Sequence, residues 1–211
     1  MEEGLDNYDS PLVQQRRKSI HFRLLGILPL MFFLLQGIHY WRIAELGHML
    51  WMCNIGNLVL ALGLFSNKSA VIRVSVLWMI PGLVVWIIYV VLEWGVFFSS
   101  TLAHVGGFVT GLIALRKVGM DRHAWFHALL WYFVVQVLSR LLTPAKLNVN
   151  VSHAIDQGWK GSFDSYWKFW LVLTFLVAAC LWVLGMILAK VFPISRTDKQ
   201  TAVMCGPPQN Y

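Results

Sequence analysis

Six apolar stretches divide the chain, and each approaches or exceeds the roughly 20 residues that a helix needs to cross a bilayer. Most have no polar face, so a soluble helical bundle could not accommodate them. Only 13% of the residues are charged, which is too little polar surface to cover a soluble domain. We predict an all-α, multi-pass protein of the cell membrane (the inner membrane in a bacterium), a bundle of six transmembrane helices. The predicted spans are 24–41, 46–65, 70–94, 97–116, 123–143 and 167–192.

The basic residues predict the orientation of these spans. If the N-terminus is cytoplasmic, 12 of the 17 Lys and Arg residues fall on the cytoplasmic side. Cytoplasmic flanks carry such an excess, so both termini are predicted to be cytoplasmic. The net charge of +7 reflects this bias, and no nucleic-acid partner is predicted.

The transmembrane domain is expected over 21–192. Residues 1–20 and 193–211 are polar and lack apolar periodicity, so they are predicted to be flexible cytoplasmic tails. One long connection, 144–166, falls on the extracytoplasmic side, and loops of this length are often functional. It contains Asn150-Val-Ser152, a formal acceptor sequence for N-glycosylation.

Polar residues interrupt three spans at one depth. At about 1.5 Å per residue, Cys53, His104 and Gln136 each lie roughly 10 Å below the extracytoplasmic surface. Asn54 and Asn57 lie on the same side of their helix as Cys53. Such groups avoid lipid, so they are predicted to face the bundle interior as a candidate site. Candidate binding residues closer to the surface are His48, Glu93, Arg140 and His153.

Two glycines follow the intramembrane histidine. Gly107 and Gly111 form a GxxxG step, which allows a neighbouring helix backbone to approach closely. We therefore expect the helix that carries His104 to lie inside the bundle.

The residue types at this depth are consistent with nucleophilic catalysis. A cysteine attacks an ester as its thiolate, and a nearby histidine can accept the thiol proton. Asn54, Asn57 or Gln136 could donate to a developing oxyanion. A site in the outer leaflet suits a lipid substrate. No sequence motif indicates a metal site or a particular cofactor.

The stretch AHVGGFVTG, residues 103–111, resembles the AHxxGxxxG signature in the last core helix of rhomboid intramembrane proteases. In that family the histidine is the general base of a Ser/His dyad. The resemblance implies a base role for His104, although the sequence contains no GxSG serine motif.

A longer resemblance follows the order of three segments, namely LWMCNI, FFSSTLAHVGGFVTGLIAL and LNVNVS…SYWKFW. This order is similar to that of YwaF-like integral membrane proteins, some of whose relatives are acyltransferases with an intramembrane Cys and His. The resemblance implies that Cys53 is the nucleophile and His104 its base.

Two functional hypotheses follow. In the first, the protein is a lipid acyl-transfer or lipid-hydrolysing enzyme whose catalytic residues are Cys53 and His104. In the second, the same polar residues join helices, as amides and histidines often do in membrane bundles. The protein is then a non-catalytic subunit or assembly factor with protein partners in a larger membrane complex.

The predicted orientation can be tested at the C-terminus. A fluorescent reporter that folds only in the cytoplasm, fused after Tyr211, should be active. A reporter that is active only outside the cytoplasm should be silent at the same position. The reverse pattern would invert the topology.

Overall fold

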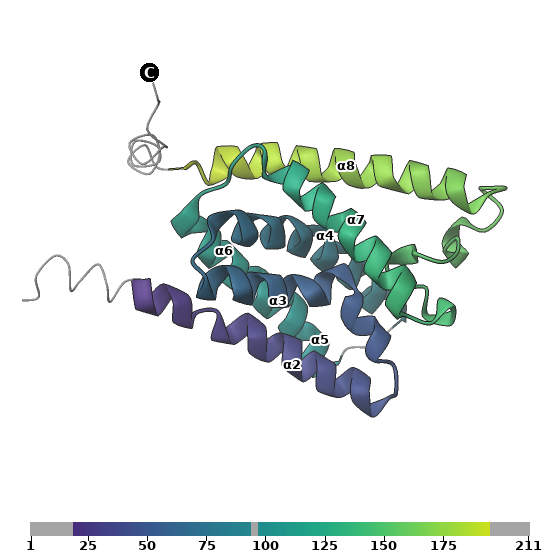
Figure 1. Cartoon of the computed structure of the whole chain (residues 1–211), viewed down its shortest axis with the longest axis horizontal. Helices are drawn as coiled ribbons and strands as arrows, with labels where there is room; N and C mark the ends of the chain where they lie inside the picture. Colours follow the sequence, from purple (N-terminus) through teal and green to yellow (C-terminus); the bar gives the residue numbers. More distant parts are fainter. Residues whose placement is uncertain (1–18, 94–96, 195–211) are drawn as a thin grey trace, which may run out of the picture.

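The structure, a computed structural model, describes residues 19–93 and 97–194. Most of the tails predicted at 1–20 and 193–211 lies outside these residues, as does the side chain of Glu93. The described part is all-helical and contains no β-strand. One isolated β-bridge joins Lys160 and Phe163. Its α-helices (Figure 1) are α2 (Ile27–Arg42), α3 (Met52–Phe65), α4 (Ser69–Glu93), α5 (Phe98–Thr101), α6 (Gly107–Val118), α7 (Ala124–Leu142) and α8 (Tyr166–Val191).

Within residues 19–93 and 97–194, five helical segments are long and apolar enough to cross a membrane, as expected for a multi-pass membrane protein. One includes α2 and the residues before it, and another joins α5 and α6 through a π-helical turn, η2 (Leu102–Gly106). The five segments are Ser19–Arg42, Ser69–Leu92, Phe98–Val118, Ala124–Leu142 and Tyr166–Val191.

The predicted span over 46–65 is broken. It forms a 3₁₀ helix, η1 (Leu46–Leu50), and the 14-residue α3, separated at Trp51 with φ −53° and ψ 133°. At about 1.5 Å per residue, α3 is about 21 Å long, which is less than the roughly 30 Å of a hydrocarbon core. The prediction of six full spans is therefore not confirmed.

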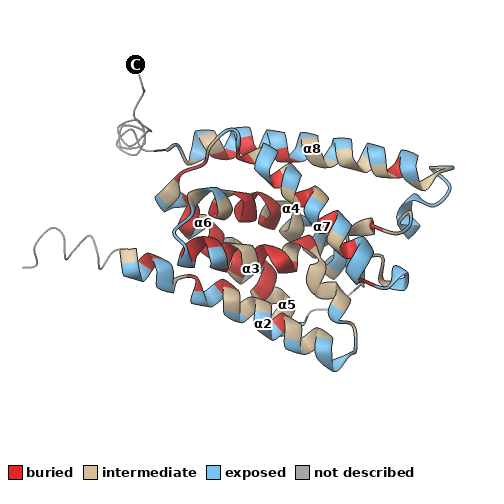
Figure 2. Ribbon diagram, viewed as in Figure 1, coloured by how far each residue is buried: buried red, intermediate tan, exposed pale blue. Residues whose placement is uncertain are grey.

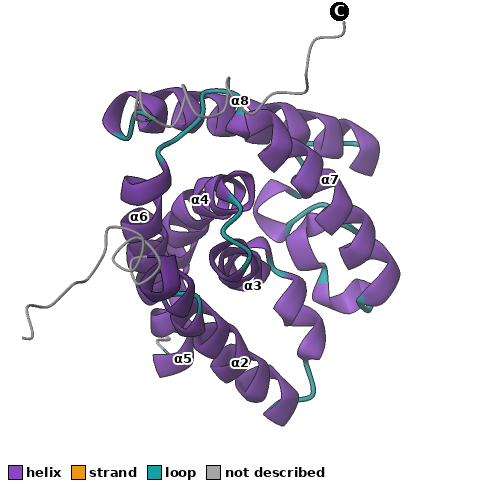
Figure 3. Ribbon diagram, turned by 60° about the vertical axis from the view of Figure 1, so that its left-hand side comes forward, coloured by secondary structure: helices purple, strands orange, loops and turns teal. Residues whose placement is uncertain are grey.

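The short helix α3 lies in the middle of the bundle. Figure 3 shows it surrounded by the other helices, and most of its residues are buried, as Figure 2 shows. Leu60, Ala61 and Leu64 are fully buried. Irregular backbone at membrane depth is tolerated where protein covers it. The surrounding helices thus explain how a helix too short to span can occupy the bundle.

The side chain of Asn150 satisfies the backbone at the break before α3. Its Oδ1 accepts from the Met52 N–H at 3.0 Å, and its Nδ2 donates to the Leu50 carbonyl at 2.7 Å. The same Nδ2 donates to Ser139 Oγ of α7 at 2.9 Å. Asn150 has φ 52°, a left-handed conformation that Asn adopts more readily than most residues. One loop residue therefore joins the 144–166 connection to α3 and α7.

The two ends of the described chain lie at the same end of the bundle. In Figure 1 the purple start of the first helical segment and the yellow end of α8 are both at the left. Although it is short, α3 returns the chain from the end of α2 to the start of α4. The described chain thus runs back and forth along the bundle, although only five of its helical segments are long enough to span a membrane.

The expected close approach at the GxxxG step is confirmed. A Cβ added at Gly107 would overlap the Asn57 amide, and one at Gly111 would lie 3.1 Å from Val76 and 3.2 Å from Met79 Sδ. The absence of side chains on this face of α6 therefore lets α3 and α4 approach its backbone.

The Asn150 contacts lead to a stability prediction. Asn150→Ala leaves the Met52 N–H and the Leu50 carbonyl without their partner, at a cost of about 1–3 kcal/mol for each group. We expect a lower melting temperature in detergent than for the wild type. The exposed loop variant Gln157→Ala serves as the control and should melt like the wild type. Equal melting of the two variants would contradict this role for Asn150.

Candidate functional site

His104 lies in the π-helical turn η2, between α5 and α6. Its Nδ1 is 2.8 Å from the Ser100 carbonyl oxygen, which can only accept a hydrogen bond. In the neutral ring the proton therefore sits on Nδ1, and Nε2 keeps its lone pair. π-helical turns are rare and frequently occur at functional sites.

The His104 ring is also held from the side of α4. It stacks on Trp86, with ring centroids 5.2 Å apart and planes at 14°. Trp86 Nε1 in turn donates to Ser100 Oγ at 2.9 Å. A carbonyl, a hydroxyl and an indole thus fix both the tautomer and the orientation of the imidazole.

Cys53 approaches the same helix one turn away. A Cβ added at Gly82 would lie 2.9 Å from Cys53 Cβ, so the glycine provides the space for this close contact. Gly82 and Trp86 are four residues apart and share a face of α4. Cys53 and His104 therefore contact adjacent turns of one helix. Within the described residues, no hydrogen bond joins the Cys53 thiol to the imidazole.

The two asparagines of α3 are buried and bridge between segments. Asn57 Nδ2 donates to the Ala103 carbonyl at 2.9 Å and to the Cys53 carbonyl at 3.2 Å. Asn54 Nδ2 donates to the His48 carbonyl at 2.9 Å. Asn57 thus connects α3 to the π-helical turn, directly beside the backbone of His104.

Some of the amide oxygens near Cys53 have no partner. Gln36 Oε1 and Asn54 Oδ1 are buried and accept no hydrogen bond from any described residue. One of these oxygens is on α2 and the other on α3, and both lie inside the protein.

The other predicted site residues lie around the break before α3 and the loop. His48 Nδ1 accepts from Trp51 Nε1 at 2.8 Å, and its Nε2 lies 3.1 Å from Glu45 Oε2. Gln136 Nε2 donates to the Asn150 carbonyl at 2.8 Å, so this amide holds the loop. The remaining two are Arg140, which donates to the Ser152 carbonyl at 2.7 Å, and His153, whose buried Nε2 has no partner in the described chain.

The structure thus divides most of the predicted site into two groups. Cys53, Asn54, Asn57 and His104 gather around α3, α4 and the π-helical turn, and His48 in η1 joins this group through its carbonyl, which accepts from Asn54. Gln136, Arg140 and His153 belong to the contacts between α7 and the loop. Glu93 cannot be assigned to either group, because its side chain lies outside the described residues.

Sequence reasoning missed the aromatic residue of the site. Trp86 stacks on His104, yet in the sequence it looks like an ordinary aromatic residue of a membrane span. For the contact between Ser100 and His104 the sequence did contain a signal. The two residues are four apart, and residues at this spacing on a helix can bond to each other.

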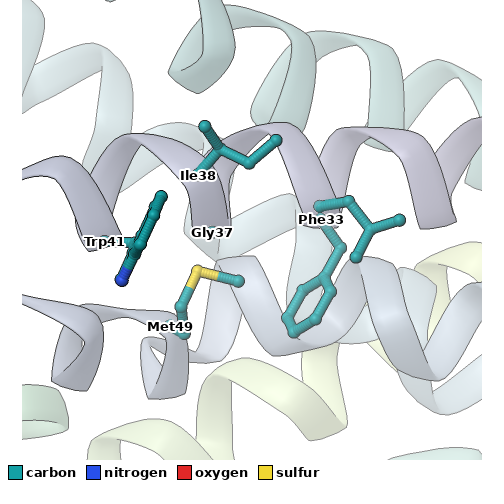
Figure 4. A pocket seen from close by; sticks show the side chains of 6 residues that line it. Phe33, Gly37, Ile38, Trp41 and Met49 are labelled. Carbon is teal, nitrogen blue, oxygen red and sulfur yellow. The ribbon is translucent and has the colours of Figure 1, made fainter.

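An apolar groove runs along α2 close to this region. Its volume is about 230 Å³, and Met49 of η1 lies below Gly37, as Figure 4 shows. Because every lining residue is apolar, the groove suits a hydrocarbon chain rather than a polar ligand. The lining residues are Phe33, Leu34, Gly37, Ile38, Trp41 and Met49.

The described residues contain no group of three or more His, Cys, Asp or Glu side chains that could hold a metal ion. The chain matches no protein-family model, no curated protein and no solved structure.

The contact between Asn57 and Gly107 leads to a prediction for this site. In Gly107→Ala the new methyl group would overlap the Asn57 amide, which two carbonyls hold in place, so the variant should lose about 1–3 kcal/mol of stability through overpacking. Melting in detergent measures this effect. Gly158→Ala, in the exposed loop, adds the same methyl group at an ordinary contact distance and should have little effect.

Proposed function

We propose that this multi-pass membrane protein handles lipid in the outer leaflet, with Cys53 as nucleophile and His104 as general base of acyl transfer or ester hydrolysis. Both termini are cytoplasmic in this proposal, and α3 with η1 completes an even number of passes. The excess of Lys and Arg on one side supports this orientation. The common side of the two chain ends in Figure 1 supports it further.

The proposed reaction begins with proton transfer from the Cys53 thiol to His104 Nε2. The thiolate adds to the ester carbonyl, the carbon–oxygen bond to the leaving alcohol breaks, and the imidazolium returns the proton to that alcohol. Water or a second alcohol then attacks the thioester, losing its proton through the same nitrogen and releasing the free thiol. Every proton taken by His104 is returned within the cycle.

The single observation that carries this proposal is the fixed imidazole. The Ser100 carbonyl holds Nδ1 protonated, so the basic nitrogen is the one left for a substrate or a thiol. Cys53 contacts α4 one turn from the tryptophan on which this ring stacks. In this proposal, rotation of the Cys53 side chain on substrate binding brings its sulfur to His104 Nε2.

In this proposal an amide N–H stabilises the oxyanion. Asn57 Nδ2 already donates to two backbone carbonyls, whereas Asn54 Nδ2 and Gln136 Nε2 each donate one of their two N–H groups. Gln136 is directed to the loop, so Asn54, the residue after Cys53, is the preferred donor. The groove beside Gly37 could accommodate an acyl chain of the substrate.

A covalent intermediate provides the direct test. Purified protein is incubated with a phospholipid bearing a labelled acyl chain, and the thioester is located by mass spectrometry after proteolysis. We expect the label on Cys53, and no label or product with Cys53→Ser. His104→Ala should reduce the rate at least about 100-fold, as for loss of a general base.

Matched variants distinguish these effects from general damage. Cys180 is exposed on α8 and His127 is exposed on α7, so Cys180→Ser and His127→Ala should keep the full rate. A labelled Cys180, or full activity of both Cys53→Ser and His104→Ala, would refute the proposal.

A non-catalytic subunit or assembly factor remains the alternative function. The bridging of α3 to the π-helical turn by Asn57 favours it, because here a buried polar residue serves packing. In this case the wild type would form no thioester, and it would co-purify with a partner in stoichiometric amount.

A further inference from the structure

Arg140, in the last turn of α7, is held beside the first turn of α8. Its guanidinium carbon lies 5.5 Å from the centroid of the Tyr166 ring and 5.8 Å from that of Trp167. Its Nη1 donates to the Ser152 carbonyl at 2.7 Å. Two aromatic rings and one carbonyl therefore restrict the position of an otherwise exposed and flexible side chain.

Most of the hydrogen-bonding capacity of Arg140 is unused. A guanidinium carries five N–H donors, and only one hydrogen bond to Arg140 is present in the described chain. No described carboxylate pairs with it, because the ion pairs found there join Glu45 to His48 and Asp164 to Lys168. The planar donor group is available for an anion from outside the protein.

The first turn of α8 supplies the aromatic support for Arg140. The helix begins at Tyr166, and the two charged residues on either side of this start, Asp164 and Lys168, pair with each other at 2.8 Å. The Tyr166 hydroxyl donates a hydrogen bond to the carbonyl oxygen of Ser152 in the loop, at 2.7 Å. This bond holds the Tyr166 ring next to the Arg140 guanidinium.

The surroundings indicate which anion is available there. Trp167 is 61% exposed, and Leu141 and Leu142 beside Arg140 are 74% and 66% exposed. Exposed apolar and Trp side chains at the end of a spanning helix are typical of the level of the lipid headgroups. The anion present in quantity at that level is the phosphate of phospholipids, and guanidinium groups bind phosphate in a bidentate manner.

We propose that Arg140 and the first turn of α8 form a binding site for the phosphate group of a phospholipid. The site does not depend on catalysis at Cys53. It is linked to α3 through the loop, because Arg140 holds Ser152 while Asn150, two residues earlier, bonds to Met52.

Binding to purified protein in neutral detergent tests this proposal. Native mass spectrometry measures the affinity for dihexanoyl phosphatidylglycerol, for dihexanoylglycerol, which lacks the phosphate, and for inorganic phosphate. We expect binding of the phospholipid, and at least about tenfold weaker binding by Arg140→Gln, the loss expected for one hydrogen bond to a charged group. Neither dihexanoylglycerol nor inorganic phosphate should match the phospholipid.

Control variants separate the site from general charge and folding effects. Arg42 is an exposed arginine at the end of α2, and Arg42→Gln should bind like the wild type. Trp167→Leu keeps the Arg140 bond to Ser152 and should still weaken binding severalfold. Cys180→Ser, at an exposed cysteine of α8 outside both proposed sites, should bind fully.

Three outcomes would overturn the proposal. Arg140→Gln and Trp167→Leu could both bind like the wild type, which would leave Arg140 a support for the loop only. Equal binding of dihexanoylglycerol would show an apolar surface without phosphate recognition. Equal binding of inorganic phosphate would exclude the lipid headgroup as the preferred ligand.

Discussion

Much of this fold depends on the hydrogen bonds that satisfy the backbone on either side of Trp51, where the helix breaks. A helix that breaks within a membrane domain leaves N–H and carbonyl groups that lipid cannot bond, at a cost of several kcal/mol for each. Asn150 bonds to the groups on both sides of the break and to α7 as well. As a result α3 can start below the surface and lie among the other helices. This position buries Asn54 and Asn57 and leaves Cys53 half-buried.

Helix α4 is the surface that the candidate catalytic residues share. Its Gly82 accommodates Cys53, while Trp86 one turn later supports the imidazole. Pro81 lies inside this helix without ending it, since α4 continues to Glu93. The small residue beside the proline therefore serves the contact with α3. In the proposed reaction, the placement of Cys53 and His104 depends on a helix that supplies none of the reacting atoms.

Much of the fold could be predicted from the sequence, because apolar length and glycine spacing are local signals. The five long helices and the close approach at Gly107 followed from them. The break before α3 could not be predicted, because residues 46–65 contain no proline or charged residue and the residue that stabilises the break is 100 positions away from Leu50. In the sequence Asn150 looked like a glycosylation site, whereas in the fold its nitrogen is already bonded. Counting residues along the helix predicted that Gln136 lies at the depth of His104. It could not predict where the Gln136 side chain points, which is toward the loop.

The distance along the chain between α3 and Asn150 has a consequence for biogenesis. The bonds that complete the start of α3 join residues 98 and 100 positions apart. At about 5–20 residues per second, translation supplies Asn150 roughly 5–20 seconds after Leu50. Until then the broken segment has no partner for its free backbone groups and cannot settle in lipid. The segment therefore has to remain in a hydrated or protein-lined environment during synthesis, and membrane insertion of this chain is completed only after α7 and the following loop emerge.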